Sequence, residues 1–309
     1  MRGFVNIDKP QGITSFDVVR QIRRAAHMKR VGHAGTLDPL ATGVLPIAVG
    51  DATRLVDELI GARKRYRAEI LLGRETDTYD IDGQVTAEVD ASGVTLDAVR
   101  TALGAFTGEV MQVPPAYSAV KRGGQRAYRA ARRGEPLLLE PRPVRVYGIE
   151  PLELVHEEGI ARLTVDVACG QGFYVRSLAH DLGAALGVGG TIAALRRTQV
   201  GPFLVEHATP LDRAIVLLES GEIKDLVQPP DAVLGHLPMW IMRDDEVGRM
   251  RNGLSMRLPG TLNAAASLDV PQVRCYGPHG ELIGLLRPQG AEGLWHPFRV
   301  FPPDTIAPR

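Results

Sequence analysis

Apolar residues follow helical spacing in some segments of the chain and strict alternation in others. Thr14 or Ser15 is placed to cap a first helix. The apolar side of this helix is expected to consist of residues at helical spacing, namely Phe16, Val19, Ile22 and Ala26. Alternation over 66–73 and over 162–169 predicts two strands, each with one face directed into a core.

Three further helices are expected downstream. One begins after Thr95, whose hydroxyl can cap it. Another runs from about 177 to the glycine at 187, a residue suited to a helix end. Its buried side is expected to comprise Leu178, Leu182 and Ala185. A short helix should open at 209–210, where a threonine cap precedes a proline suited to the first turn.

The character of the sequence changes near residues 228–231, which read Gln-Pro-Pro-Asp. Beyond this point short β-prone runs alternate with turns, as at 273–276, 277–280 and 281–286. This pattern is typical of hairpins. We therefore expect two domains, over residues 1–230 and 232–309, the second small and rich in strands.

Composition narrows the class of protein. The chain has 309 residues, of which 44% are apolar and 23% charged, as in globular proteins. No run approaches the roughly 20 apolar residues that span a bilayer, and the start lacks the apolar core of a secretory signal. Cys169 and Cys275 are the only cysteines, so neither a disulfide framework nor a cysteine-based zinc site is expected. A cytoplasmic protein is predicted.

Charge is balanced overall but unevenly distributed. Formal net charge is zero, yet residues 121–145 carry eight basic and two acidic side chains. Residues 20–30 add five basic side chains and no acidic one, and 63–67 add four more around a tyrosine. Such runs are often solvated surface. Three of them in a neutral chain favour a phosphate backbone as partner.

Several common chemistries lack their motifs. The sequence contains no phosphate-binding loop, dinucleotide fingerprint, HExxH metal motif or GxSxG nucleophile elbow. A glycine-punctuated stretch at 31–43 holds His33 and Asp38 close together. Proline follows Asp38 and stiffens the turn. The carboxylate of Asp38 is therefore either a structural part of this turn or a reactive group beside a ligand. Composition leaves both readings open.

Six segments, in order along the chain, resemble motifs of the bacterial tRNA pseudouridine-55 synthases of the TruB type. The segments are 8–15, 32–46, 64–83, 114–121, 172–183 and 195–198. They cover about residues 3 to 200. The resemblance implies an enzyme that isomerises uridine to pseudouridine in the T-arm loop of tRNA by flipping out the base.

The family's fold and partners follow as expectations. The resemblance implies an α+β fold with a mixed, mostly antiparallel sheet, flanking helices and a small C-terminal β-barrel of the PUA type. It implies no cofactor and no metal, tRNA as partner, no membrane and no required protein partner, and a monomer.

The resemblance also implies a role for each matched residue. Asp38 corresponds to the family's essential carboxylate and Arg176 to its ion-pair partner. Tyr66 corresponds to the tyrosine that stacks on uracil and can help remove the C5 proton. The remaining substrate-binding candidates are His33, Tyr174, Leu195 and Lys9. His33 would fill the space left by the flipped base.

The basic segment 121–145 matches the position of the family's RNA-clasping insertion. Its candidate contacts to the RNA backbone are Lys121, Arg122, Arg126, Arg129, Arg132 and Arg133. Two alternatives stay open at this point. The protein could be an RNA-binding or RNA-folding protein whose catalytic residues are vestigial, or a relative that modifies another RNA through a guide complex.

Overall fold

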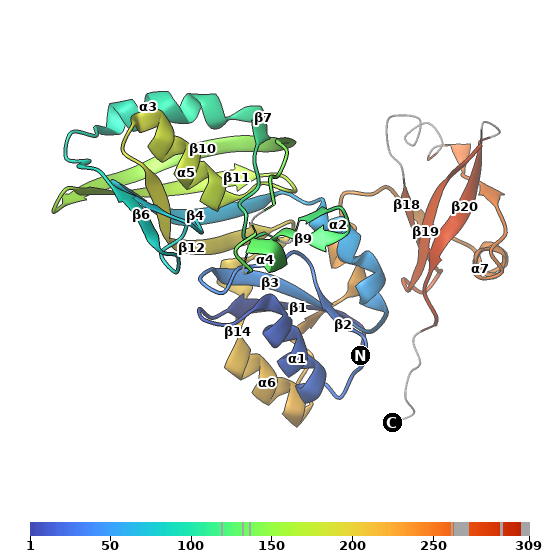
Figure 1. Cartoon of the computed structure of the whole chain (residues 1–309). Coiled ribbons are helices and arrows are strands. Elements are labelled where there is room, and N and C mark those ends of the chain that lie inside the picture. Colours follow the sequence, from blue (N-terminus) through green and yellow to red (C-terminus); the bar gives the residue numbers. More distant parts are fainter. Residues whose placement is uncertain are drawn as a thin grey trace.

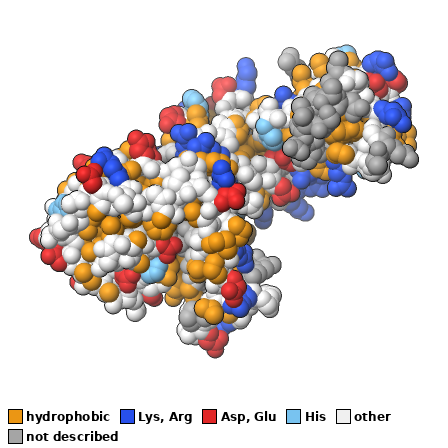
Figure 2. All heavy atoms as spheres, turned by 90° about the horizontal axis from the view of Figure 1, so that it is seen from above, with side chains coloured by type: hydrophobic (Ala, Val, Ile, Leu, Met, Phe, Trp, Pro, Cys, Tyr) orange, Lys and Arg blue, Asp and Glu red, His pale blue; other side chains and the backbone are white. Residues whose placement is uncertain are grey.

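The computed structural model describes residues 1–118, 120–131, 133–135, 137–260, 262, 272–290 and 293–303. Within these ranges the chain forms a large sheet with helices and a smaller C-terminal sheet (Figure 1). The space-filling view shows the C-terminal part at one end of an elongated molecule (Figure 2). No helix in the described residues is long and apolar enough to cross a membrane.

The large sheet has the strand order β14-β1-β3-β12-β4-β11-β10-β7, with β2, β13 and β15 paired at its side. Neighbours are antiparallel except for β1–β14 and β3–β12. The strands are β1 Gly3–Lys9, β2 Val31–His33, β3 Thr42–Val49, β4 Lys64–Leu72, β7 Gly108–Gln112, β10 Arg142–Glu157, β11 Ile160–Cys169, β12 Gly190–Val200, β13 Phe203–Leu204, β14 Thr209–Pro210 and β15 Val227–Gln228. The predicted mixed, mostly antiparallel sheet is confirmed.

Helices cover this sheet and complete its core. They are α1 Ser15–Ala25, α2 Val56–Ile60, α3 Leu96–Leu103, α4 Ala127–Ala131, α5 Val175–Leu186 and α6 Leu211–Ser220, with short 3-10 turns at Gly50–Leu55, Gly104–Phe106, Val205–His207 and Pro230–Val233. Apolar side chains of α1, α3, α5 and α6 join those of the strands in one buried cluster. Two short ribbons lie outside the sheet, β5 Arg74–Thr76 with β6 Val85–Glu88 and β8 Lys121–Arg122 with β9 Gln125–Arg126.

The C-terminal sheet has the order β16-β18-β19-β20-β17. Its elements are β16 Met239–Ile241, α7 Asp244–Arg251, β17 Met256–Arg257, β18 Val273–Tyr276, β19 Leu282–Gln289 and β20 Leu294–Val300. It has its own core around Trp240, Met250 and Trp295. A further cluster joins Phe4 of β1 to Phe301 across the boundary, so the two parts pack against each other.

The strands predicted from alternation and the helix capped by Thr95 are present, and three details of the sequence interpretation are wrong. Phe16 is 61% exposed, because α1 buries Ser15, Val18, Val19, Ile22 and Ala25 and this stripe excludes position 16. Ala185 on α5 is exposed as well. Residues 209–210 form strand β14 rather than a helix start, since Thr209 pairs with Ile7 and α6 begins only at Leu211.

Candidate active site

Asp38 lies in the loop between β2 and β3, and α1 holds that loop in place. The Oγ of Ser15 accepts a hydrogen bond from the amide of Leu37 (2.8 Å) and donates to its carbonyl (3.0 Å). The Asp38 carbonyl accepts from the amide of Ala41 (3.1 Å), which closes a tight turn at Asp38-Pro39. Asp38 is therefore in a stiff turn, and its side chain is still 41% exposed. Both readings of the sequence motif are compatible with this position.

A buried arginine supports the same loop from the sheet side. Arg197 of β12 is 1% exposed and donates to the carbonyls of Val44 (2.7 Å) and Gly35 (3.0 Å). Gly43 has φ +97°, and a Cβ there would lie 2.2 Å from the Arg197 carbonyl oxygen. The parallel contact between β3 and β12 therefore needs glycine at position 43, because a side chain would separate the two strands.

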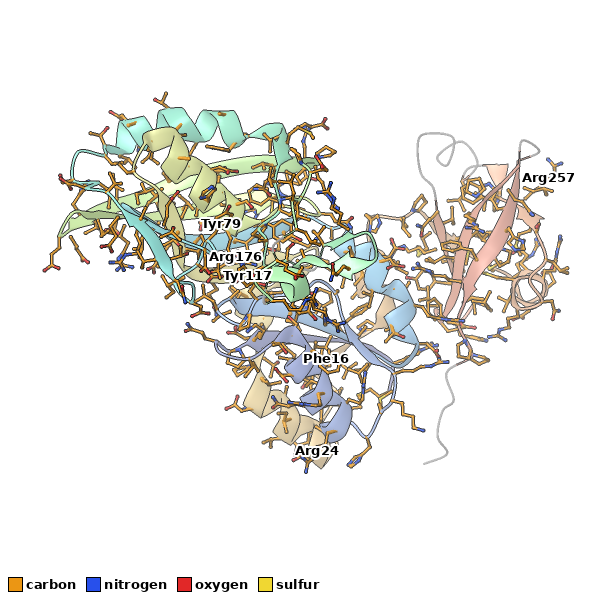
Figure 3. All side chains as sticks on the ribbon, in the orientation of Figure 1. Phe16, Arg24, Tyr79, Tyr117, Arg176 and Arg257 are labelled. Atoms are coloured by element: carbon orange, nitrogen blue, oxygen red, sulfur yellow. The ribbon has the colours of Figure 1, made fainter. Side chains whose placement is uncertain are left out.

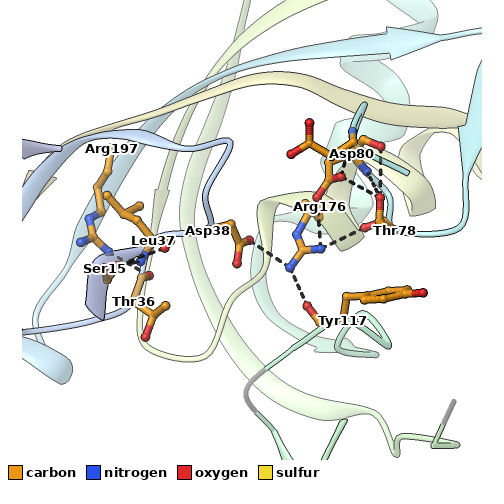
Figure 4. Close-up of polar contacts among 10 residues, drawn as sticks. Ser15, Thr36, Leu37, Asp38, Thr78, Asp80, Tyr117, Arg176 and Arg197 are labelled. Atoms are coloured by element: carbon orange, nitrogen blue, oxygen red, sulfur yellow. Dashed lines mark hydrogen bonds and ion pairs between the residues drawn. The ribbon is translucent and has the colours of Figure 1, made fainter. Parts of the chain in front are cut away.

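Arg176 on α5 joins Asp38 to the opposite side of the site (Figure 4). Its Nη2 lies 2.9 Å from Asp38 Oδ2 and donates to the Tyr117 carbonyl at 2.8 Å. Its Nη1 lies 3.3 Å from Asp80 Oδ2 and donates to the Thr78 carbonyl at 3.0 Å. The guanidinium is buried and fixed by four acceptors. It therefore holds the exposed Asp38 carboxylate in one direction.

Asp80 was not singled out from the sequence, although it lies in one of the six matched segments. Its side chain is 9% exposed. Burial raises the pKa of Asp80, and the Thr78 hydroxyl and Arg176 oppose this shift while the nearby Asp38 adds to it. Arg176 thus lies between two carboxylates, one buried and one accessible. The accessible one, Asp38, is the group that a substrate can reach.

The turn that carries Asp80 is locked to its surroundings. The Thr76 hydroxyl donates to the Asp80 carbonyl (2.8 Å) and lies 2.9 Å from the hydroxyl of Thr191 on β12. Tyr79 has φ +63°, an unusual conformation for a residue with a side chain. Its ring stacks on His180 of α5, with centroids 4.1 Å apart and planes inclined by 9°. The stack keeps the turn against the helix that carries Arg176.

Tyr66 and Leu195 are brought to the same region by adjacent strands. Tyr66 on β4 is 9% exposed and pairs in register with Arg197 of β12. Burial raises the pKa of the Tyr66 phenol, which keeps it protonated. Leu195 on β12 pairs with Ala68 of β4 and is half-buried. These two side chains supply an aromatic and an apolar surface near the polar pair.

Tyr174 lies two residues before Arg176, and His33 lies at the start of the segment that leads to Asp38. Tyr174 precedes α5, and its backbone exchanges two hydrogen bonds with the Gln112 side chain, at 2.8 and 3.0 Å. Burial raises the pKa of its phenol. His33 ends β2; burial and then the charge of Arg197 lower its pKa, which favours a neutral ring. Its Nδ1 is buried and has no hydrogen-bond partner in the described part of the chain.

Lys9 does not fit its predicted role in binding substrate. The side chain is fully buried, and Nζ donates to the carbonyls of Pro10 (2.8 Å), Ile13 (2.8 Å) and Pro39 (3.3 Å). Burial lowers its pKa to about 8, against the opposing effect of Asp38. Because its three donors are engaged by the backbone, Lys9 fastens the segment after β1 to the Asp38 loop. This corrects the sequence interpretation.

The basic segment forms a hairpin and a short helix. Arg122 on β8 is exposed and pairs with Glu140 (3.0 Å), while Arg129 on α4 lies beside Tyr128. Arg133 lies 3.9 Å from Glu135. Arg132 and the side chains of Lys121 and Arg126 lie outside the described residues. The last two arginines of the segment, at 142 and 145, belong to β10 of the large sheet.

Within the described residues, no three His, Cys, Asp or Glu side chains come together as metal ligands. The site as described offers one exposed carboxylate, its arginine, an aromatic ring and an apolar wall. Such a set can stabilise or trap a cationic carbon beside a flat heterocycle.

Comparison with known proteins agrees with this geometry. Residues 23–175 match the model of the TruB family pseudouridylate synthase N-terminal domain, and 176–234 match that of the tRNA pseudouridylate synthase B C-terminal domain. Proteins named tRNA pseudouridine synthase B are similar over nearly the whole chain. That of Dehalococcoides mccartyi is 42% identical over 97% of both chains, and that of Arthrobacter sp. 42% over 100% of this chain and 99% of the other.

Solved structures share the fold. An H/ACA RNP bound to a substrate RNA containing 2′-deoxyuridine includes a chain 27% identical, with a TM-score of 0.71 over 97% of this chain and 85% of that one. A Cbf5-Nop10-Gar1 complex gives 29% identity and a TM-score of 0.67 over 92% of this chain and 78% of the other. On its sequence motifs, its family-model matches and these relatives, the chain belongs to the TruB family of pseudouridylate synthases.

Proposed function

We propose that this chain converts uridine to pseudouridine at position 55 in the T-arm loop of tRNA, with Asp38 as the catalytic carboxylate. Two observations support the proposal. The relatives named tRNA pseudouridine synthase B match along the full chain. Asp38 is the exposed member of a buried charge network, held 2.9 Å from Arg176.

The reaction requires a carboxylate, and it leaves the atomic composition of the nucleoside unchanged. The N1–C1′ bond breaks, uracil turns, a C5–C1′ bond forms, and the C5 proton leaves while N1 gains a proton. Bond breaking develops positive charge at the sugar, which a carboxylate can stabilise or trap. Addition of Asp38 to C6 of the base is the other route. Both need the Asp38 carboxylate in a fixed position, and the contact with Arg176 at 2.9 Å supplies this.

The remaining residues have roles that match their positions. Tyr66 and Leu195 would hold the flat faces of uracil. Burial keeps the phenol of Tyr66 protonated, so Tyr66 would not take the C5 proton as a phenolate. It would instead act through a base or a water molecule that takes this proton. The neutral ring of His33 suits the space left by the flipped nucleotide, because an uncharged ring stacks there at a lower desolvation cost.

The outer parts of the molecule would hold the tRNA. Residues 121–145 would clasp the RNA backbone through Arg122, Arg129 and Arg133, with an affinity that falls as salt rises. The domain from 232 to 309 would bind RNA as a PUA-like module beside the catalytic domain of 1–230. We expect a cytoplasmic monomer that acts without a protein partner.

The test is conversion of an unmodified tRNA transcript labelled with tritium at C5 of uridine. We expect tritium release close to one equivalent per tRNA, and no release from a transcript with cytidine at the target position. Tight binding without release would favour an RNA-binding protein with vestigial catalytic residues. Release only after addition of a guide RNA would favour the second alternative, which the similarity to RNP structures makes worth testing.

A further inference from the structure

The exposed face of α1 combines an aromatic ring with a row of arginines. Phe16 is 61% exposed. The residues at helical spacing on the same side are Arg20, Arg23 and Arg24, and all three are exposed. We call Phe16, Arg20, Arg23 and Arg24 the α1 stripe. It is the second of the basic runs noted in the sequence, and the function proposed above does not use it.

The stripe starts beside the catalytic loop. Phe16 directly follows Ser15, whose hydroxyl holds the backbone of Leu37 next to Asp38. Figure 3 shows Phe16 at the end of α1 nearer to Arg176 and Arg24 at its far end. The two are eight positions apart along the helix, which is about 12 Å. A ligand that leaves the Asp38 site along α1 would therefore meet the ring first and the arginines next.

The charges of the stripe are only partly neutralised. Arg20 pairs with Asp17 at 2.8 Å, and Arg23 donates to the Val31 carbonyl at 3.1 Å. In the described part of the chain, the guanidinium of Arg24 has no ion pair and no hydrogen bond. Further along, Lys29 is exposed too. Arg24 therefore gives the stripe a free positive charge, and an anionic ligand is the partner that complements it.

A phosphate group complements the arginines of the α1 stripe but not the exposed ring of Phe16. The ring lies outside the buried stripe of α1, so it contributes little to the core. Aromatic rings beside cationic side chains are the usual platform for single-stranded nucleic acid, because bases stack on the ring while the backbone contacts the charges. We propose that the α1 stripe binds the strand of the substrate RNA next to the flipped uridine, stacking a nucleotide on Phe16 and contacting a phosphate through Arg24. This inference rests on the proposed function.

The experiment measures RNA affinity and chemistry separately. Phe16→Ala and Arg24→Ala are compared with wild type for their Kd toward a T-arm stem-loop, over a range of salt, and for single-turnover conversion at saturating enzyme. Matched controls are Val216→Ala and Arg100→Ala, which truncate an exposed apolar and an exposed basic side chain on α6 and α3. Unchanged melting temperatures would show that all variants fold.

We expect Phe16→Ala to raise the Kd about tenfold, as loss of one stacked base does. Arg24→Ala should reduce the slope of log Kd against log salt by about 0.7 to 0.9. For both variants, the rate of conversion by RNA-bound enzyme should stay within about twofold of the wild-type rate, since neither residue touches the reacting atoms. Kd values and salt slopes equal to those of the controls would overturn the inference. Failure of wild type to convert RNA would instead overturn the proposed function.

Discussion

Replacing Arg176 by lysine tests whether the site depends on the fork of the guanidinium or only on a positive charge. Nη2 of Arg176 contacts the Asp38 carboxylate and the Tyr117 carbonyl. Its Nη1 contacts the Asp80 carboxylate and the Thr78 carbonyl. A lysine ammonium is a single point and cannot reach both sides at once. One side of the network must lose its donor.

The magnitude follows from what is left without a partner. A buried acceptor that loses its donor costs about 1 to 3 kcal/mol. The Asp80 side holds a buried carboxylate and a carbonyl, so its loss should lower the free energy of unfolding by about 2 kcal/mol or more. On the other side Asp38 is 41% exposed and water can solvate it, so loss of that side should cost only about 1 kcal/mol, through the Tyr117 carbonyl. If Asp38 loses its support, a displacement of about 1 Å would lower the rate roughly 100-fold.

The assay is single-turnover conversion with enzyme in excess, together with urea unfolding. Arg162→Lys is the matched control, because Arg162 pairs with Glu69 at 3.1 Å where both side chains are about 40% exposed. That variant should behave as wild type, since exposed pairs contribute about 0 to 1 kcal/mol. If Arg176→Lys kept both the stability and the rate of the control, the assignment of a bidentate role to Arg176 would be wrong.

Three further predictions concern the supports of the site. His180→Ala should slow conversion by RNA-bound enzyme, whereas His180→Phe should restore the rate because it keeps a ring against Tyr79. If His180→Ala and His180→Phe converted RNA at the same rate, the stack would have no role in the reaction. Gly43→Ala should sharply lower the melting temperature, because its Cβ would lie 2.2 Å from a carbonyl oxygen of β12, whereas Gly93→Ala, with open space around it, should not. Burial lowers the pKa of Lys64 from 10.5 to about 8. Between these values the unfolded chain holds a proton that the folded chain lacks, so wild type should gain stability relative to Lys64→Met as pH rises through this window. Urea unfolding at several pH values checks this, and a constant difference would contradict it.

Local patterns in the sequence were enough for much of the secondary structure. Alternation identified β4 and β11 because both bury one face and leave most of the other face partly or fully exposed. Thr95 identified the start of α3 because its hydroxyl accepts from the amide of Ala98, a contact that depends only on nearby residues. The motifs identified the Asp38 loop and Arg176, whose contact the structure then gives as 2.9 Å.

The remaining features depend on contacts between distant segments. Phe16 has the hydrophobicity of a core residue, and only the packing of α1 leaves it outside. Two of the carbonyls that accept from Lys9 are close in sequence, at Pro10 and Ile13, but the third belongs to Pro39, 30 residues away in the Asp38 loop, and the burial of Lys9 needs that loop. Asp80 gains its importance from an arginine 96 residues away. No local pattern carries such information, since each depends on the assembled sheet.

The most direct measurement is single-turnover conversion of the T-arm RNA by Asp38→Asn. Asparagine keeps the size of the side chain and removes the charge, and Asp166→Asn in the exposed pair with Arg67 serves as the control. We predict that Asp38→Asn binds the RNA with an affinity within about threefold of wild type and forms no pseudouridine, while the control converts normally. Conversion by Asp38→Asn at the rate of the control would contradict the account.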